Sequence, residues 1–235
     1  MYKERISVFK VLSNVISIGA GNIAKFVLAM LIPSLVFFII CLFSGLITGS
    51  VTILSGFSIG EVLLCIIVYL VMIFAICIPL SVGTYYIARN YQDTHEIVFS
   101  DILVCFKKNM VLKSIGLSLL MTIILIVGYI LLVIPGVILT YMFIFAFIVM
   151  IDNPKLGILE VISLSAKLSK GYKLKIFGYN ILLGIIPALV YVLLRGSIVG
   201  ILIYFIICLV ISAFNLLGLG FFYMDSLDWL QNQVK

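Results

Sequence analysis

In residues 131–178 long apolar runs alternate with short polar connections. One apolar run ends at Ile134-Pro135-Gly136, and the next, residues 137–151, carries no charge. A polar break, a segment of mixed character and four lysines then precede another apolar run. Runs of this kind cross a bilayer as helices, and basic residues anchor their ends. The segment therefore predicts a helical membrane protein.

The composition of the whole chain leads to the same prediction. Of its 235 residues, 65% are hydrophobic and 10% are charged, and the mean hydropathy is +1.38. Because a soluble domain carries about 25% charged residues, this chain could not cover a water-exposed surface. A cleavable signal peptide is not expected, since the first strongly apolar run begins only at Phe26 and no A-x-A site follows it.

Six membrane-spanning helices are predicted within one domain, residues 1–235. They lie at about 26–48, 62–88, 114–134, 137–151, 176–194 and 198–224. Amphipathic helices are predicted at 1–25, at about 99–110 and at about 154–170, where they would lie on the membrane surface. Ser100 or Asp101 can cap the second of these, and Asn153 can cap the third with Pro154 in its first turn.

Prolines and charge add detail to this all-α architecture. Each of four prolines predicts a helix break or kink, and these are Pro33, Pro79, Pro135 and Pro187. The third and fourth spans are either a hairpin or one long broken helix, and their total length favours the hairpin. Three times an amphipathic segment ends in a lysine (Lys25, Lys113, Lys175) and leads into a span, which suggests three repeats of a surface helix plus a hairpin.

The basic residues predict the orientation. Of 15 Lys and Arg, 14 fall in the N-terminal segment, the second–third and fourth–fifth connections and the tail, while Arg195 alone falls on the other side. By the positive-inside rule both termini, and the amphipathic helices, are cytoplasmic. This placement, without a basic stripe among exposed aromatics, also excludes nucleic acid as a partner for the net charge of +6.

Catalytic and metal-binding patterns are missing from the sequence. His95-Glu96 begins the zinc motif H-E-x-x-H, but Phe99 replaces the second ligand and His95 is the only histidine. Asp93, Glu96 and Asp101 are most simply a solvated charged face, with a weak metal or headgroup site as the alternative. The five cysteines show no C-x-x-C spacing and are expected to be small buried hydrophobes, with a Cys41–Cys65 disulfide as the alternative. We therefore predict no enzyme, no catalytic or metal site and no cofactor.

The candidate binding residues are charged side chains at the ends of the spans. Five lysines could contact anionic lipid headgroups or act only as topology determinants, and these are Lys107, Lys108, Lys170, Lys173 and Lys175. Glu61 and Arg195 would form a charge pair at the outer face or serve as separate interfacial anchors. Asn180 and Asn215 are unfavourable in lipid and are expected to face other helices.

Several short motifs resemble a known family. They are Ile134-Pro135-Gly136, Asp152-Asn153-Pro154, Ser165, the run from Lys170 to Phe177, and Pro79-Leu80-Ser81-Val82-Gly83 followed by Phe99-Ser100-Asp101. Over residues 78–194 the chain resembles bacterial six-span membrane proteins classed as a domain of unknown function. These are distantly similar to the membrane domain of glycerophosphodiester phosphodiesterases. The resemblance implies a bacterial cytoplasmic-membrane protein, and the hydrolase's catalytic domain has no counterpart here.

Together these observations predict a non-enzymatic six-span protein that binds, senses or moves an amphiphile. The amphiphile would be a lipid, a membrane-active peptide or an apolar small molecule, and the expected partners are membrane lipids. The alternative is a structural or accessory subunit of a larger membrane complex such as an exporter, with another membrane protein or further copies of this chain as partners.

Overall fold

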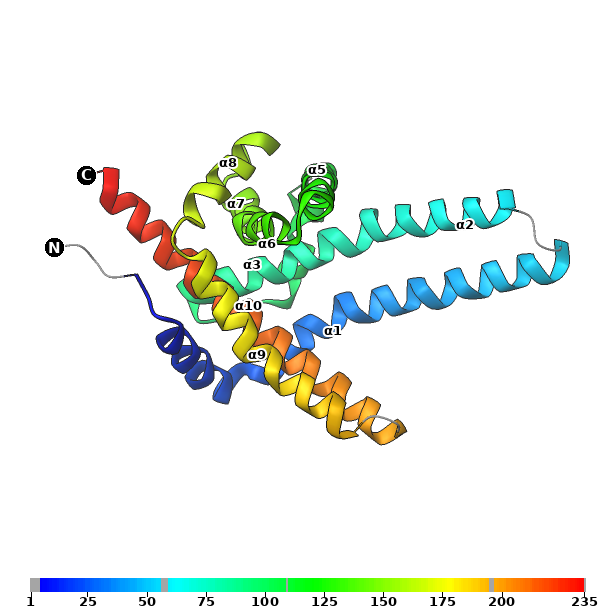
Figure 1. The fold of residues 1–235 in the computed structure, drawn as a ribbon, viewed down its shortest axis with the longest axis horizontal. Coiled ribbons are helices and arrows are strands. Elements are labelled where there is room, and N and C mark those ends of the chain that lie inside the picture. Colours follow the sequence, from blue (N-terminus) through cyan, green and yellow to red (C-terminus); the bar gives the residue numbers. More distant parts are fainter. Residues whose placement is uncertain (1–4, 56–58, 109, 195–196, 235) are drawn as a thin grey trace.

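The computed structural model describes residues 5–55, 59–108, 110–194 and 197–234, and among these it contains helices and no strand (Figure 1). Within these described ranges, six helical stretches are long and apolar enough to cross a membrane. They are Gly21–Ser50, Ile59–Thr94, Val111–Leu131, Val133–Asp152, Lys173–Leu194 and Val199–Asn232. The all-helical class and the six membrane-length helices are thus confirmed.

The individual helices differ greatly in length. In chain order they are α1 (Val8–Ser55), α2 (Ile59–Met72), the π-helical turn η1 (Ile73–Cys77), α3 (Ile78–Thr94), the 3₁₀ turn η2 (Phe99–Leu103), α4 (Val104–Lys107), α5 (Val111–Leu131), α6 (Val133–Met142), α7 (Ala146–Asp152), α8 (Ile158–Leu168), α9 (Lys173–Leu194) and α10 (Ile198–Val234). With 48 residues, α1 is about 72 Å long. The predicted amphipathic helix and first span are therefore one helix, not two.

The prolines interrupt fewer helices than expected. Pro33 and Pro187 lie inside α1 and α9, which continue on both sides of them. Pro79 is the second residue of α3, which follows η1 directly. The Ile78 N–H donates to the Ile73 carbonyl, so a π-helical turn precedes the proline while the helix continues. Pro135 lies in the first turn of α6.

The chain reverses direction close to Pro135. Leu132, with φ −166° and ψ 147°, is the one extended residue between α5 and α6. The two helices then pack side by side, and the Tyr129 hydroxyl of α5 lies 3.0 Å from the Thr140 hydroxyl of α6. A side chain at Gly136 would meet the Tyr129 ring at 2.5 Å, so this glycine permits the close approach.

Two predicted helix starts are wrong. Helix α8 begins at Ile158 with Gly157 as its N-cap, and the Gly157 N–H donates to the Glu160 carboxylate over 2.7 Å. Asn153 instead ends α7, where its side-chain amide donates to the Val149 carbonyl. The predicted helix at 99–110 is the short pair η2 and α4, and neither Ser100 nor Asp101 caps it, since Val98 is the N-cap without a side-chain bond.

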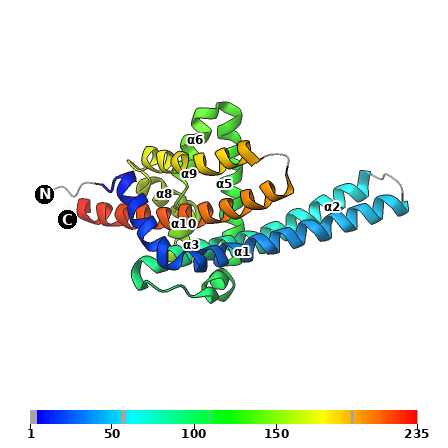
Figure 2. The same cartoon turned by 90° about the horizontal axis from the view of Figure 1, so that it is seen from below.

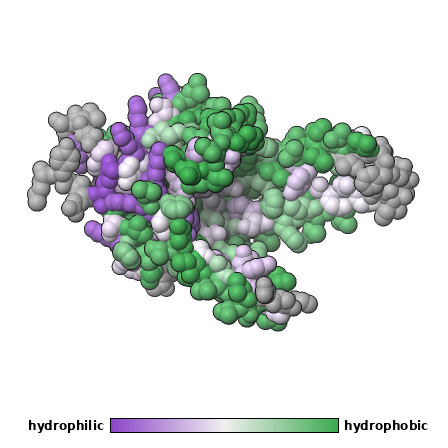
Figure 3. All heavy atoms as spheres, in the orientation of Figure 1, coloured by the Kyte–Doolittle hydropathy of each residue, from purple (hydrophilic) through white to green (hydrophobic). Residues whose placement is uncertain are grey.

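The helices form three pairs that point in different directions. Helices α1 and α2 extend beyond the rest of the molecule as an arm, whereas the α5–α6 and α9–α10 pairs leave in other directions (Figures 1 and 2). The start of α1 and the end of α10 lie at the end opposite the tip of the arm, and hydrophilic residues gather there (Figures 1 and 3). We call this end the base. Among the described residues, the six largest fully buried side chains are aromatic, and they are Tyr172, Tyr179, Tyr223, Phe26, Phe145 and Phe222.

Candidate functional site

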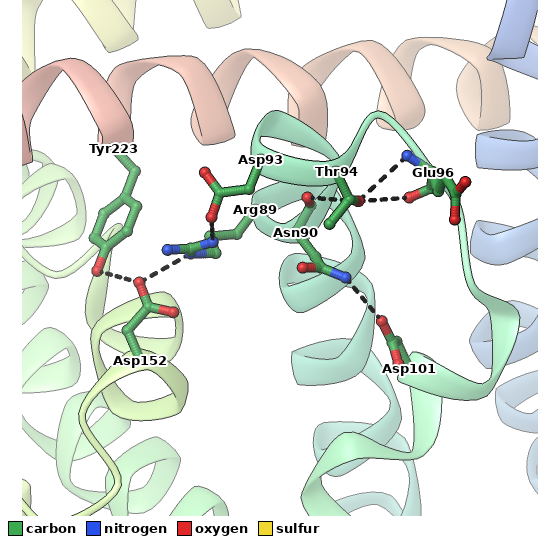
Figure 4. A network of polar contacts seen from close by, with 8 residues as sticks. All are labelled: Arg89, Asn90, Asp93, Thr94, Glu96, Asp101, Asp152 and Tyr223. Carbon is green, nitrogen blue, oxygen red and sulfur yellow. Dashed lines mark hydrogen bonds and ion pairs between the residues drawn. The ribbon is translucent and has the colours of Figure 1, made fainter.

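An ion-pair network joins three helices in the base (Figure 4). The Asp152 carboxylate, at the end of α7, accepts from Arg89 Nε of α3 at 3.1 Å and from the Tyr223 hydroxyl of α10 at 2.9 Å. Arg89 also pairs with Asp93, one turn further along α3. Because the Arg89 and Asp152 side chains are only 21% and 18% exposed, the loss of either partner would leave a poorly solvated charge.

The remaining acidic residues of this region point to separate partners. The Asp101 carboxylate accepts from the Asn90 amide at 3.2 Å, and Glu96 is bonded to the Thr94 hydroxyl through its backbone. His95 ends α3 in a left-handed conformation with φ 56°. In the described part of the chain no three His, Cys, Asp or Glu side chains are placed to hold a metal ion.

A second polar cluster ties the N-terminal segment to the base. Asp225 of α10 accepts the Ile6 N–H at 2.9 Å and the Tyr172 hydroxyl at 2.7 Å. Lys175 Nζ donates to the carbonyls of Arg5 and Ile6, at 3.1 and 2.9 Å. Burial, followed by the hydrogen bond to Asp225, raises the pKa of Tyr172 above its usual value.

The predicted headgroup lysines have different surroundings. Lys175 binds the N-terminal segment, whereas Lys107, Lys108 and Lys170 are exposed and Lys173 is half-buried. The Lys108 ammonium also lies 5.1 Å from the Tyr86 ring centroid.

Within the spans, Asn180 and Asn215 meet each other. The Asn215 amide donates to the Asn180 carbonyl oxygen at 2.7 Å, and the Asn180 amide donates to the Tyr141 hydroxyl at 3.3 Å. These bonds connect α6, α9 and α10 and confirm that both asparagines face other helices.

Two apolar cavities follow each other along α1. The root cavity, of about 700 Å³, lies between α1, α10 and the η1–α3 junction. Its lining is Leu31, Pro33, Ser34, Leu35, Phe37, Phe38, Cys77, Ser81, Leu202 and Phe205. The arm cavity, of about 450 Å³, lies between α1 and α2. Its lining is Ile39, Ile40, Phe43, Ser44, Ile47, Glu61, Leu64, Cys65, Val68, Tyr69 and Met72.

The two serine hydroxyls in the wall of the root cavity are hydrogen-bonded to nearby backbone carbonyls. The Ser34 hydroxyl donates to the Met30 carbonyl and the Ser81 hydroxyl to the Cys77 carbonyl, both at 2.8 Å. The cavity wall is therefore apolar in effect, which suits an alkyl chain or another apolar group. The sequence predicted helix breaks at Pro33 and Pro79 in this region, but the cavity itself arises from how the helices cross.

Of the predicted pair of Glu61 and Arg195, only Glu61 lies among the described residues. Glu61 lies in the first turn of α2 and lines the arm cavity. Arg195 lies outside the described residues, so the pair stays a prediction. All five cysteines are free, which excludes the Cys41–Cys65 disulfide, and Cys41 Sγ instead lies 3.3 Å from the Tyr69 hydroxyl.

No family model, curated protein or solved structure matches the chain. The resemblance to the bacterial six-span family thus stays a prediction.

Proposed function

We propose that this chain is a multi-pass protein of the bacterial cytoplasmic membrane that binds an amphiphile in the root cavity, and thereby senses or moves it, without catalysing a reaction. The observation that carries the proposal is the cavity itself. Its volume of about 700 Å³ falls within the usual range of ligand pockets, roughly 300–1,000 Å³. Apolar walls between membrane-length helices favour a ligand drawn from the bilayer.

The helices around the root cavity are irregular where they line it. Pro33 lies within α1, and Cys77 is the last residue of η1, next to the start of α3. Proline and π-helical turns remove or displace backbone hydrogen bonds, and π-helical turns occur frequently at functional sites. The helices that form the cavity walls would bend at these positions when a ligand enters or leaves.

The proposed topology has three hairpins with the base and both termini in the cytoplasm. Supporting this, an even number of spans returns the chain to the side on which it began, and the start of α1 and the end of α10 both lie at the hydrophilic base (Figures 1 and 3). Lys107, Lys108, Lys170 and Lys173 belong to the connections on that side, where lysines favour the cytoplasmic, anionic surface. The amphipathic α8, with exposed Leu159, would lie at the interface.

Native mass spectrometry of protein released gently from its own membrane tests the proposal. A lipid or other amphiphile of defined mass should stay bound to the wild-type protein. The change Leu202→Trp fills the root cavity and should remove it, whereas Ile201→Trp, on an exposed neighbour outside the cavity, should not.

Two outcomes would contradict amphiphile binding. Wild-type protein that carries no small species would do so, and so would one that loses its ligand equally in both variants. A heavier complex with a second protein and no bound small species would favour the accessory-subunit alternative.

A further inference from the structure

A row of polar side chains joins α6, α9 and α10 within their membrane-length stretches. The Asn215 amide donates to the Asn180 carbonyl oxygen, and the Asn180 amide donates to the Tyr141 hydroxyl. We call these three side chains the polar row. We propose that the polar row binds the carbonyl oxygen of an ester-linked lipid, with the Tyr141 hydroxyl as the donor. This inference rests on the proposed membrane topology and adds a binding site separate from the root cavity.

The polar row ends in a donor that has no acceptor within the described part of the chain. Both amides donate in the same direction, so the Tyr141 oxygen accepts a bond while its own O–H is left over. Hydrogen bonds in such a series polarise one another, which makes the last O–H a better donor. Among hydrocarbon chains no water is present to accept it, and a polar group without a partner is unfavourable there. Because none of the three side chains is charged, the row favours a neutral acceptor from the bilayer.

The turn of α6 that carries Tyr141 is held in place by its neighbours. Helix α6 ends at Met142, whose carbonyl accepts from the Ser165 hydroxyl of α8 at 3.1 Å. The Tyr141 ring meets the Phe177 ring of α9 edge-on, with the ring centroids 5.6 Å apart. The donor is therefore positioned before a ligand arrives, which lowers the cost of ordering it on binding.

The depth of the polar row matches the linkage between a lipid headgroup and its chains. Asn180 lies seven residues after Lys173, the first residue of α9, which is about 10 Å along the helix. The polar layer of a bilayer is roughly 5–8 Å thick on each side, so the row would lie where the hydrocarbon begins. Ester carbonyls lie at this boundary. Since all three side chains of the row are half-buried, a lipid beside the protein can reach them.

The test compares two lysophosphatidylcholines that differ in one linkage. The 1-oleoyl probe has an ester carbonyl, and the 1-O-oleyl probe has an ether in its place. Each is titrated into the protein in nanodiscs of ether-linked phosphatidylcholine, and binding is measured by native mass spectrometry. The ester probe should bind about fivefold more tightly, which corresponds to about 1 kcal/mol for one hydrogen bond. A ¹³C label in the ester carbonyl adds a direct readout, because a hydrogen bond from Tyr141 should lower its infrared stretching frequency.

Matched variants assign the effect to the polar row. Tyr141→Phe removes the donor and keeps the ring, so both the ester preference and the frequency shift should disappear. Tyr191→Phe, which removes an exposed hydroxyl further along α9, should keep both. Leu202→Trp should also keep both, because Leu202 lies in the root cavity, about 20 Å along α10 from Asn215.

Equal binding of the two probes, or an ester preference that persists in Tyr141→Phe, would overturn this site. A preference that is lost in Leu202→Trp but kept in Tyr141→Phe would also overturn it, since the carbonyl would then bind in the root cavity. Failure of both probes to bind would have the same consequence. None of these results decides the root-cavity proposal, which is tested by the ligand that the protein carries from its own membrane.

Discussion

Replacing Gly83 by alanine should open the contact between α3 and η2. A Cβ at this position would lie 2.0 Å from the Ile102 carbonyl oxygen and 2.5 Å from its carbonyl carbon. Both atoms belong to the backbone, so α3 and η2 would have to separate by about 1.5 Å to reach normal contact. Overpacking of this kind typically costs about 1–3 kcal/mol, and a clash with backbone belongs at the upper end.

Cys105 reports on this contact. It lies in α4, directly after η2, and is completely buried. Burial raises the pKa of the Cys105 thiol to about 11, and only the thiolate reacts with alkylating reagents. In protein whose other four cysteines are serine, Cys105 should therefore react slowly at pH 8. A loss of about 3 kcal/mol raises the open population, and thus the labelling rate, by about 100-fold.

The matched control is Gly184→Ala, in α9. A Cβ at Gly184 meets no atom within 4 Å, so this variant should keep the slow labelling and gain up to about 1 kcal/mol of helix stability. If Gly83→Ala labels as slowly as the wild type and unfolds at the same temperature in detergent, the described crossing of α3 and η2 is wrong.

Three further predictions concern the polar contacts. Asp225→Asn should weaken the bonds to Ile6 and Tyr172 by about 1.5–3 kcal/mol and speed proteolysis at the N-terminus, while far-UV circular dichroism stays unchanged. Because the pKa of Tyr172 is raised from its usual 10.0, its contribution to stability is fully present below pH 10 and falls above it, where the unfolded state alone loses the proton. Alkaline unfolding should therefore be shallower in Tyr172→Phe. Asn215→Leu should destabilise the protein by about 0.6–2 kcal/mol in thermal unfolding, since Asn180 loses its partner, and a neutral result would refute that bond.

The six membrane-length helices were predictable because apolar runs and charge placement directly reflect the solvent around them. That Asn180 and Asn215 face other helices was also predictable, since an amide in lipid needs a partner, but that they bond to each other was not. The helix boundaries were less predictable. Asn153 and Gly157 are both acceptable N-caps, and the choice depends on tertiary contacts such as the bond from Lys113 to the Pro154 carbonyl.

Most of the candidate site could not be predicted from the sequence. Lys175 looked like a headgroup ligand, yet its ammonium binds carbonyls of Arg5 and Ile6, about 170 residues away along the chain. The cavities exist because α1 crosses α10 and pairs with α2, and no local pattern encodes such a crossing. Glu61 stood out in the sequence as a charge at the edge of a span, but its place in a cavity wall required the structure.

Photo-crosslinking in intact membranes would show whether the root cavity binds a lipid chain. Cells would incorporate a fatty acid bearing a diazirine near the end of its chain, and crosslinked peptides would be mapped by mass spectrometry after irradiation. If the root cavity holds a lipid chain, crosslinks should concentrate on its residues Phe37, Leu202 and Phe205, and they should be lost in Leu202→Trp but not in Ile201→Trp. Crosslinks spread evenly over all exposed faces of the spans, unchanged by Leu202→Trp, would contradict it.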